Sequence, residues 1–420
     1  MTTNCSDRQV HVVMMGARNH YAGPLLLHRA GMLGRFSTDL YLFQDAWSRK
    51  ILASLPSSLR PTDIERFLGR CEPELPAERV VSFSLFGVWY WWQRRFNQKS
   101  VRMGTTHIKG AKTFNRLILR HGLTATDILY AYNSAALELF QYAKEQGIPC
   151  ILEQTSAPVD KELGLLKEEL ERWSNLEPTW TINRDNDALA QREQAEWELA
   201  DLIIAPSSFV TDALMEKHVP QSKCRVLPYG VSLERFLPVE KQESRTSSSL
   251  RILFSGEVGI QKGAPYLLEA LRFLNFSNIE ARFVGAVAFD PARLKPYRRF
   301  AEFMGPIPRS RMLEQYRWAD LLVLPSICDG FGLVVYEALA CGIPIIATRN
   351  TGAWIRDRID GLVVPIRDVE ALSRALERFV TDAEFLRFCR HNVQMNRDRV
   401  GLDAYQRRLV QTVREVMKRN

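Results

Sequence analysis

Short apolar runs, each too brief for a helix, alternate along the chain with amphipathic segments of helical length. Runs of four to eight apolar residues without polar alternation are typical of parallel strands buried on both faces. Glycine-bearing loops and predicted helices follow these runs, as in the helices expected over Leu25–Leu33 and Met312–Trp318. The pattern predicts an α/β protein with parallel sheets. The runs predicted as strands include Val10–Met15, Ile128–Ala131, Pro149–Glu153, Leu202–Ala205, Arg251–Ser255 and Leu321–Pro325.

The strongest of these units is Leu321–Thr348, with the sequence LLVLPSICDGFGLVVYEALACGIPIIAT. A loop with two glycines, Asp329–Gly332, opens a helix that runs to about Ala340. Free N–H groups and the helix dipole make such a loop suitable for a diphosphate. Asp329 is placed to accept hydrogen bonds from ligand hydroxyls, and Glu337 to bind a cis-diol such as a ribose. The alternative, a solvated helix acid beside ordinary turn glycines, stays open at this point.

A second glycine-rich loop, GEVGIQKG, follows the strand Arg251–Ser255. It begins at Gly256, ends at Lys262 and Gly263, and precedes a helix expected from Pro265. Backbone N–H groups and the lysine charge together fit a diphosphate.

A polar, serine-rich stretch divides the chain, whose 420 residues suit two domains of roughly 200 residues each. The stretch VEKQESRTSSS, residues 239–249, has the composition of a linker. We therefore expect one domain over 1–238 and a second over 250–400. The segment 401–420, with a helix over Ala404–Lys418, is expected to cross back onto the first domain.

Several polar residues of the first domain lie in loops that follow predicted strands. The carboxyl ends of parallel strands are where α/β sheets bind ligands. The loops near residues 133 and 156 therefore supply Asn133 and Ser156 as candidate ligand-binding residues, and the loop after Val10–Met15 holds Gly16, Arg18 and His20.

Val80–Trp92 is an uncharged, aromatic-rich stretch followed by Arg94, Arg95 and Lys99. It is too short to span a bilayer, but an aromatic run with a basic flank suits a membrane interface or a lipid-linked acceptor. Packing of these aromatic residues in the core is the alternative.

The composition indicates a globular protein with an expected cytoplasmic location. The net charge of +8 allows nucleic acid, an anionic membrane face or a phosphorylated substrate as partner, and no nucleic-acid motif accompanies it. No apolar run approaches the length needed to span a membrane, and the first ten residues do not resemble a signal peptide. Seven scattered cysteines without metal spacing predict free thiols in a reducing compartment. No histidine-rich or carboxylate-paired ligand set is evident in the sequence, so we expect no metal and no cofactor. A peripheral contact with the inner membrane face stays open.

The stretch DGFGLVVYEALACGIP, from Asp329 to Pro344, resembles the signature of the family 4 (group 1) retaining glycosyltransferases. These enzymes have the GT-B fold, in which two Rossmann-like domains with parallel sheets face each other across a cleft. The family usually has Glu where this chain has the shorter Asp329. The loop GEVGIQKG resembles the second family motif: Lys262 matches its lysine, and Glu257 stands where its arginine would be.

The resemblance implies transfer of a sugar from a nucleoside-diphosphate sugar, with UDP or GDP expected, to a hydroxyl of a glycan, a lipid-linked molecule or a small molecule. It implies retention of anomeric configuration, no metal, and a nucleobase held near Gly305–Ile307. Lys262, Asp329 and Glu337 would be catalytic, with Lys262 and the N–H groups of Gly330–Leu333 stabilising the leaving diphosphate. The donor would contact Gly256, Gly263, Gly305, Ile307, Gly330, Phe331, Gly332, Leu333 and Glu337. The cleft and the acceptor would be contacted by Gly16, Arg18, His20, Asn133 and Ser156, since the first loop of the family faces the cleft. The alternatives are a catalytically silent GT-B protein that binds a sugar nucleotide or glycan, and a same-fold nucleotide-sugar isomerase or phosphorylase.

Overall fold

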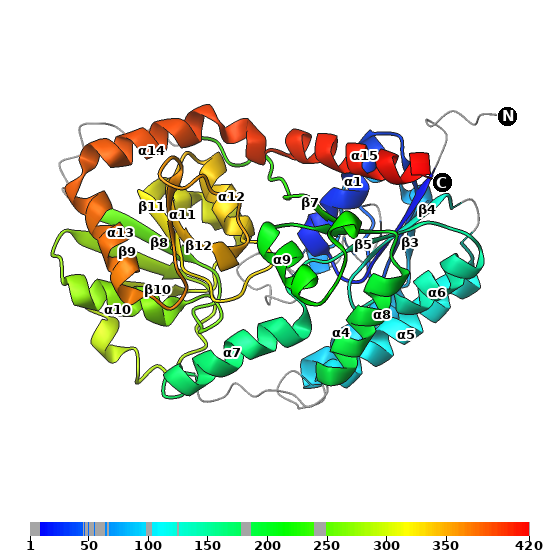
Figure 1. Cartoon of the computed structure of the whole chain (residues 1–420), viewed down its shortest axis with the longest axis horizontal. Helices are drawn as coiled ribbons and strands as arrows, with labels where there is room; N and C mark the ends of the chain where they lie inside the picture. The colour runs from blue at the N-terminus through cyan, green and yellow to red at the C-terminus, as the bar shows by residue number, and fades with distance from the viewer. Residues whose placement is uncertain are drawn as a thin grey trace.

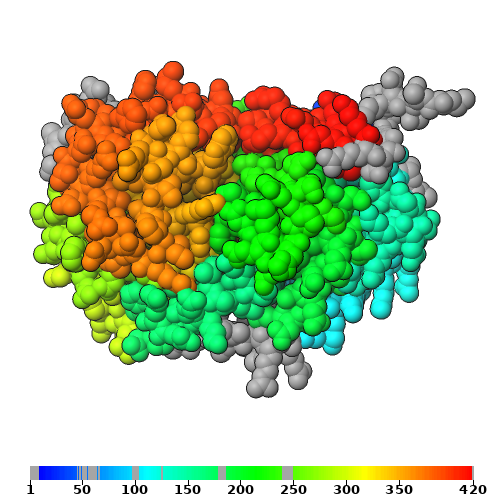
Figure 2. Space-filling view, in the orientation of Figure 1, coloured from blue at the N-terminus to red at the C-terminus, as the bar shows by residue number. Residues whose placement is uncertain are grey.

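The computed structural model describes residues 9–44, 67–97, 103–123, 126–177, 186–238 and 249–419, with the single positions 46, 49, 54 and 64. Its architecture is two parallel α/β sheets side by side, each covered by helices (Figure 1). In the space-filling view the two halves meet on the visible face (Figure 2). The α/β class and the parallel sheets are confirmed.

The first half is built on a seven-stranded sheet in the order β3-β2-β1-β4-β5-β6-β7. Its apolar strands are almost wholly buried, as the sequence pattern predicted. The strands are β1 Val10–Met14, β2 Leu33–Thr38, β3 Val80–Ser82, β4 Ile128–Tyr132, β5 Cys150–Glu153, β6 Leu202–Ala205 and β7 Cys224–Val226. The helices are η1 Arg18–Tyr21, α1 Ala22–Arg29, α4 Ser84–Asn97, α5 Met103–His121, α6 Leu137–Glu145, α7 Val159–Trp173, α8 Asn186–Leu199 and α9 Ser208–Glu216.

The second half is built on a six-stranded sheet in the order β10-β9-β8-β11-β12-β13. Its strands are β8 Leu250–Ser255, β9 Ile279–Val284, β10 Ala301–Gly305, β11 Leu321–Leu324, β12 Ile345–Thr348 and β13 Gly361–Val364. Its helices are α10 Ala264–Leu274, α11 Met312–Trp318, α12 Leu333–Ala340, α13 Val369–Thr381 and α14 Ala383–Met395, and α15 Leu402–Arg419 follows.

One predicted helix ends earlier than expected. The helix over Leu25–Leu33 is α1, which ends at Arg29 because Gly31 adopts a positive φ of 70° shortly after its last turn. Leu33 instead begins β2, in parallel register with Val10.

The strand order reverses between β1 and β4 in the first sheet and between β8 and β11 in the second. Loops that leave the carboxyl ends of strands at such a switch point border the usual ligand crevice of open α/β sheets. In this protein the two switch points face each other. A Cβ atom on Gly330, after β11, would lie 2.1 Å from the carbonyl oxygen of Thr155, after β5.

The chain crosses between the halves beside Val231. Its N–H donates to the Val400 carbonyl at 2.9 Å, and Leu402 N–H donates back to Val231 at 3.1 Å. From this crossing α15 runs alongside α1 in the first half (Figure 1), and the side chains of Tyr405 and Leu409 lie in the core against the first sheet. Residues 239–248 of the expected linker lie outside the described residues.

Helix α7 extends from the first half beneath the second (Figure 1). Tyr266 donates a hydrogen bond to Glu169 at 2.7 Å, and Glu169 also forms an ion pair with Arg367. The Arg367 guanidinium donates to the Leu165 carbonyl at 3.0 Å. Helix α7 therefore acts as a strut between the halves.

The aromatic stretch forms part of α4, and its two faces have different surroundings. Phe86 and Tyr90 are buried in the core against Phe114, whereas a row of apolar residues three and four apart faces solvent. We call this row the α4 ridge: Leu85, Val88, Trp89, Trp92 and Phe96. The alternative of core packing is therefore confirmed for one face of α4 and wrong for the other.

Candidate functional site

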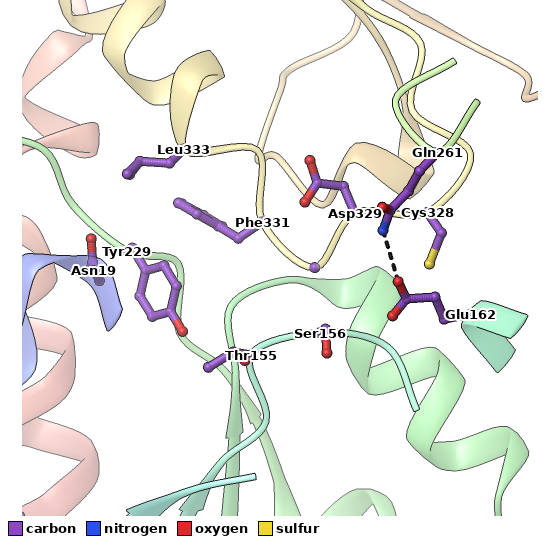
Figure 3. Close-up of a pocket in the computed structure, with 11 residues that line it drawn as sticks. Asn19, Thr155, Ser156, Glu162, Tyr229, Gln261, Cys328, Asp329, Phe331 and Leu333 are labelled. Atoms are coloured by element: carbon purple, nitrogen blue, oxygen red, sulfur yellow. Dashed lines mark hydrogen bonds between the residues drawn. The ribbon is translucent and has the colours of Figure 1, made fainter. Parts of the chain in front are cut away.

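A cavity of about 290 Å³ lies between the facing loops of the two halves. Thr155, Ser156 and Tyr229 of the first half lie opposite Asp329 and neighbouring residues of the second (Figure 3). We call this space the cleft cavity. Its lining is completed by Asn19, Glu162, Gln261, Cys328, Gly330, Phe331 and Leu333.

The structure brings together two predicted catalytic residues at the second switch point. Lys262, in the loop after β8, forms an ion pair with Asp329, in the loop after β11. Their side chains keep 24% and 13% of their surface exposed, so a ligand in the cleft can reach the pair. The Asp329 N–H donates to the Asn350 carbonyl at 2.9 Å, which holds the loop in place.

The glycine-rich loop after β8 does not present the N–H groups that its sequence suggested. Gly256 N–H donates to the Val284 carbonyl at 2.9 Å, and Gly263 N–H donates to the Ile260 carbonyl at 3.0 Å. The prediction that these two N–H groups bind the diphosphate is wrong, because the loop uses them to close on itself and on β9. This loop instead offers two side chains to the cleft, those of Gln261 and Lys262.

The signature loop shows the same effect in part. Gly332 N–H donates to the Thr351 carbonyl at 2.9 Å, and Leu333 N–H donates to Phe331 at 2.9 Å. Within the described part of the chain, the N–H groups of Gly330 and Phe331 have no protein acceptor. Of the four N–H groups expected to face a diphosphate, two are therefore available.

Glu337 is buried, with 4% of its surface exposed. Its carboxylate accepts a hydrogen bond from the Tyr316 hydroxyl at 2.7 Å and from the Arg309 guanidinium at 3.1 Å. The alternative of a solvated helix acid is therefore wrong. Glu337 does not line the cleft cavity, and both of its oxygens already have partners.

Arg235 and Arg309, which lie outside the glycine-rich loop, supply positive charge near His20. Glu257, which stands where the family has arginine, is exposed. Desolvation, together with the charges of Arg309 and Arg235, lowers the pKa of His20 to about 4. His20 therefore faces these two arginines from the first half.

The predicted first-half residues meet around η1. Asn19, His20 and Tyr21 all have positive φ, at 43°, 49° and 62°, a conformation that non-glycine residues rarely adopt and that concentrates at functional sites. The Arg18 guanidinium donates to Asn133 at 3.2 Å and to the Thr155 hydroxyl at 2.5 Å. Arg18 thereby ties the loops after β1, β4 and β5 together.

Gly16 and Ser156 also lie in this region. The Gly16 N–H donates to the Asp39 carboxylate at 2.8 Å, which fixes the start of the loop after β1. Ser156 lines the cleft cavity directly. The segment expected to hold the nucleobase, Gly305–Ile307, forms a turn at the end of β10. Gly305 has a positive φ of 68°, and Ile307 is half-buried.

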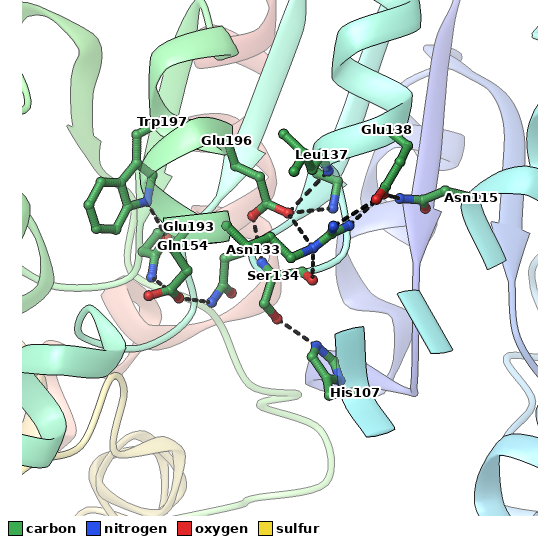
Figure 4. Close-up of polar contacts among 12 residues, drawn as sticks. His107, Asn115, Asn133, Ser134, Leu137, Glu138, Gln154, Glu193, Glu196 and Trp197 are labelled. Atoms are coloured by element: carbon green, nitrogen blue, oxygen red, sulfur yellow. Dashed lines mark hydrogen bonds and ion pairs between the residues drawn. The ribbon is translucent and has the colours of Figure 1, made fainter. Parts of the chain in front are cut away.

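Asn133 is buried and belongs to a polar network beneath the site (Figure 4). Its amide donates to Glu193 at 3.0 Å. Glu196, also on α8, accepts from the N–H groups of Ser134 at 2.6 Å and Ala136 at 2.9 Å. Burial raises the pKa of Glu196 to about 8. The network positions the loop after β4, and nothing in the sequence of α8 marked these acids as different from surface ones.

Sequence reasoning missed Glu162 at the cleft. Gln261 donates a hydrogen bond to Glu162 at 2.8 Å across the two halves (Figure 3). Burial, with the negative charges of Glu193 and Asp329, raises the pKa of Glu162 to about 7. The sequence around Glu162, two turns before Glu169, did not mark it as a cleft residue, because α7 has the pattern of an ordinary amphipathic helix. Thr155, Tyr229 and Gln261 were missed for the same reason: they meet only in the folded chain.

No group of His, Cys, Asp and Glu residues suited to a metal ion occurs within the described residues. Nor does any helix among them have the length and apolarity needed to cross a membrane.

Residues 249–382 match the family model for glycosyl transferases group 1. Curated relatives include the D-inositol 3-phosphate glycosyltransferase of Streptomyces bingchenggensis, 30% identical over 230 residues, which are 49% of this chain and 50% of the relative. The enzyme of that name from Thermobifida fusca is 28% identical over 266 residues, 57% of this chain and 58% of the relative. The matches span about half the length of these relatives.

Solved structures resemble the whole chain. Sucrose-phosphate synthase from Thermosynechococcus elongatus superposes with a TM-score of 0.62 at 17% identity, over 98% of this chain and 100% of that one. Anabaena HepE in complex with UDP-glucose gives a TM-score of 0.58 at 15% identity, over 96% and 99%. The predicted GT-B fold and the resemblance to group 1 are confirmed, whereas membership of family 4 stays a prediction. The chain thus has the GT-B fold, and its residues 249–382 match the group 1 glycosyl transferases.

Proposed function

We propose that the protein transfers a sugar from a nucleoside-diphosphate sugar to an acceptor hydroxyl, with retention of anomeric configuration. One observation carries the proposal: Lys262 and Asp329 form an ion pair at the switch point of the second sheet, within the segment that matches group 1 glycosyl transferases. The loops of the first half lie directly opposite this pair across the cleft cavity. A donor and an acceptor placed on either side of that space would meet there.

Several groups of the chain fit a donor diphosphate. Lys262 provides one cation, and the free N–H groups of Gly330 and Phe331 provide two donors in the adjoining loop. Such preorganised groups stabilise the negative charge that develops on a leaving diphosphate. Arg309 and Arg235 add positive charge on the side of the cleft that His20 faces. Asp329 is placed to accept hydrogen bonds from sugar hydroxyls once Lys262 turns to the phosphate.

The transfer also needs a base that takes the proton from the acceptor hydroxyl. We assign it to a phosphate oxygen of the leaving group. The pKa of the cleft residue Glu162, raised to about 7, is in the range that suits a general base, but its carboxyl already accepts a hydrogen bond from Gln261. The turn at Gly305–Ile307 follows β10 and would hold the nucleobase, with UDP or GDP as the nucleotide.

We also propose that the protein touches the inner membrane face through the α4 ridge and takes a lipid-linked or glycan acceptor. Helix α4 packs against α5, and neither helix contains an acidic residue. The two helices instead carry Arg94 and Arg95 on α4 and Lys109, Lys112, Arg116 and Arg120 on α5. Exposed Trp and Phe beside basic side chains suit the interface of an anionic bilayer.

A donor panel tests the transferase proposal. We would measure the melting temperature with UDP-, GDP- and ADP-sugars, since a ligand that binds only the folded state raises it. In Lys262→Ala most of this rise in melting temperature should be lost. In Lys295→Ala, which removes an exposed lysine of the same half, the rise should be unchanged.

Product analysis then separates the alternatives. Sugar transfer to an added acceptor supports the proposal. A rise in melting temperature without any product would favour a binding protein. A changed sugar nucleotide in the absence of an acceptor would favour an isomerase. No shift with any nucleotide would contradict the proposal.

A further inference from the structure

The ion pair between Lys262 and Asp329 joins two loops whose backbones are locked against each other. A Cβ atom on Gly263 would lie 1.9 Å from the Pro325 carbonyl oxygen. The loop after β8 can therefore approach the loop after β11 this closely only because residue 263 has no side chain. The backbone positions that carry the pair are fixed by this contact. A ligand can separate the two charges only by rotating the side chains.

The Lys262 side chain is arranged so that its charged end can rotate. Its aliphatic stem lies along Gly256, where a Cβ atom would be 3.8 Å from Lys262 Cγ and 3.9 Å from Lys262 Cε. The side chain keeps 24% of its surface exposed. Lysine carries a compact charge on a flexible four-carbon stem. The ammonium group can therefore turn from Asp329 towards a phosphate bound in the cleft without a movement of the loop.

Each member of the pair is the other's partner. Within the part of the chain that the structure describes, the Lys262 ammonium contacts the carboxylate of Asp329 and no other. The Asp329 carboxylate likewise accepts from no other side chain of those residues. The two groups that fit the two parts of a donor, its diphosphate and its sugar, thus neutralise each other in this arrangement.

An acidic neighbour makes the loss of Lys262 unfavourable for Asp329. Glu162, on α7 of the first half, lines the same cleft cavity as Asp329 (Figure 3). Burial and the negative charges of Glu193 and Asp329 raise the pKa of Glu162 to about 7, against a smaller opposite effect of Lys262. When Lys262 turns away, Asp329 loses its ion pair and keeps this neighbour. Its carboxylate, only 13% exposed, then gains from any group that donates hydrogen bonds to it.

We propose that this ion pair makes the donor site recognise a diphosphate and a sugar together, so that it distinguishes a nucleoside-diphosphate sugar from the nucleoside diphosphate left after transfer. The inference rests on the proposed glycosyl transfer and adds a discriminating role for Asp329. The diphosphate takes Lys262, and the sugar hydroxyls then donate to Asp329 in place of the lysine. A nucleoside diphosphate takes the lysine but has no sugar to donate to Asp329.

The same exchange favours release of the product nucleotide. Once the sugar has left, the Asp329 carboxylate is again without a hydrogen-bond donor. It attracts the Lys262 ammonium away from the phosphate, and the ion pair forms again. The nucleotide thereby loses the cation that held its diphosphate.

Titration calorimetry without an acceptor tests the inference with three pairs of probes: UDP and UDP-glucose, GDP and GDP-mannose, and ADP and ADP-glucose. In the pair that binds, Asp329→Asn should raise the affinity for the nucleoside diphosphate about tenfold, because Lys262 no longer has to leave a carboxylate. The affinity for the nucleotide sugar should not rise, because the sugar loses its charged hydrogen-bond acceptor.

A double-mutant cycle separates this exchange from a simple effect of charge. In the background of Lys262→Met, Asp329→Asn should lose most of its gain in affinity for the nucleoside diphosphate, since there is no ion pair left to break. Repulsion between Asp329 and the phosphates alone would give the same gain with and without the lysine.

Three further variants serve as controls. Asp329→Glu keeps the charge and should keep the wild-type affinity for the nucleoside diphosphate. Asp357→Asn removes an exposed carboxylate of the same half, keeps an oxygen that accepts from Val363 N–H, and should change nothing. Melting temperatures show which variants fold. Asp329→Ser also removes the charge and gives the same test if Asp329→Asn does not fold.

Three results would overturn the inference. They are an unchanged affinity of Asp329→Asn for the nucleoside diphosphate, an equal gain for the nucleotide and its sugar, and an equal gain with and without Lys262. Each of them leaves the transferase proposal standing if the wild type binds a nucleotide sugar and transfers its sugar. If the wild type binds none of the six probes, the transferase proposal fails, and this inference fails with it.

Discussion

Gln261 donates a hydrogen bond to Glu162 at 2.8 Å, so residues 99 positions apart join the two halves at the edge of the cleft cavity. The contact places a buried carboxyl beside Asp329, and the pKa of Glu162 is raised to about 7. An acid with a raised pKa favours the folded state when it is protonated. Its stabilising effect is therefore complete below pH 4.5, the ordinary value for Glu, and is lost as the pH rises through about 7.

Glu162→Gln should therefore raise the melting temperature relative to wild type at pH 8 and change it much less at pH 5. The substitution keeps an oxygen that accepts from Gln261 and removes the charge. Glu171→Gln, at an exposed position of the same helix, is the matched control and should behave alike at both pH values. A difference between wild type and Glu162→Gln that does not depend on pH would contradict the assignment.

Lys262→Ala should lower kcat roughly a hundredfold, because it removes a preorganised cation from the developing charge of the leaving diphosphate. Steady-state rates at saturating donor measure the effect, with Lys295→Ala as control. If turnover at saturating donor were unchanged, the role proposed for Lys262 would be wrong.

Gly330→Ala should abolish transfer without unfolding the protein. The added methyl group would lie 2.1 Å from the Thr155 carbonyl oxygen, a backbone atom of the opposite half, so the halves would have to separate. Small-angle scattering should show a more extended molecule, and the transfer rate should fall with it. A fully active variant with the wild-type scattering profile would rule out the close approach.

Gly164→Ala should stabilise the protein by about 0.5–1 kcal/mol, since alanine loses less backbone entropy than glycine in a helix interior. Gly164 lies in α7, and a Cβ atom there would meet no other atom within 4 Å. Chemical denaturation measures the gain. The variant also serves as the control for Gly330→Ala, because it makes the same change of residue without a clash.

Trp92→Ser combined with Phe96→Ser should weaken binding to vesicles that contain anionic lipid by at least about tenfold, because each ring contributes roughly 1.5–3 kcal/mol when buried. Co-sedimentation gives the bound fraction. Phe273→Ser, at an exposed phenylalanine of α10 in the other half, is the matched control. Equal vesicle binding by the double variant and wild type would argue against contact through the α4 ridge.

The sequence predicted the parts of the fold that depend on local pattern. The strand Leu202–Ala205 and the helix Met312–Trp318 have the expected bounds, because buried strands and amphipathic helices have their own periodicity. The sequence also assigned Lys262 and Asp329 to one ligand site, but it did not predict the ion pair between them.

Other features were beyond the sequence pattern because they depend on backbone contacts between distant segments. Gly256 and Gly263 looked like a phosphate cradle, yet their N–H groups are used within the protein. The burial of Glu337 depends on Tyr316 and Arg309, which nothing in its own helix indicated. Arg18, Arg70 and Arg94 come from three separate segments, and only the folded chain shows that they line one cavity in the first half.

The position of α15 has a consequence for synthesis on the ribosome. Domains usually fold from the N-terminus onward as the chain emerges. In this protein the core against the first sheet includes Tyr405, Leu409 and Val413, which come later in the chain than the whole second sheet. The segments that form the second sheet, from Leu250 to Val364, are all translated before them. The core of the first half therefore stays incomplete, with apolar surface exposed to solvent, until α15 has been translated. The core of the second half can form before that.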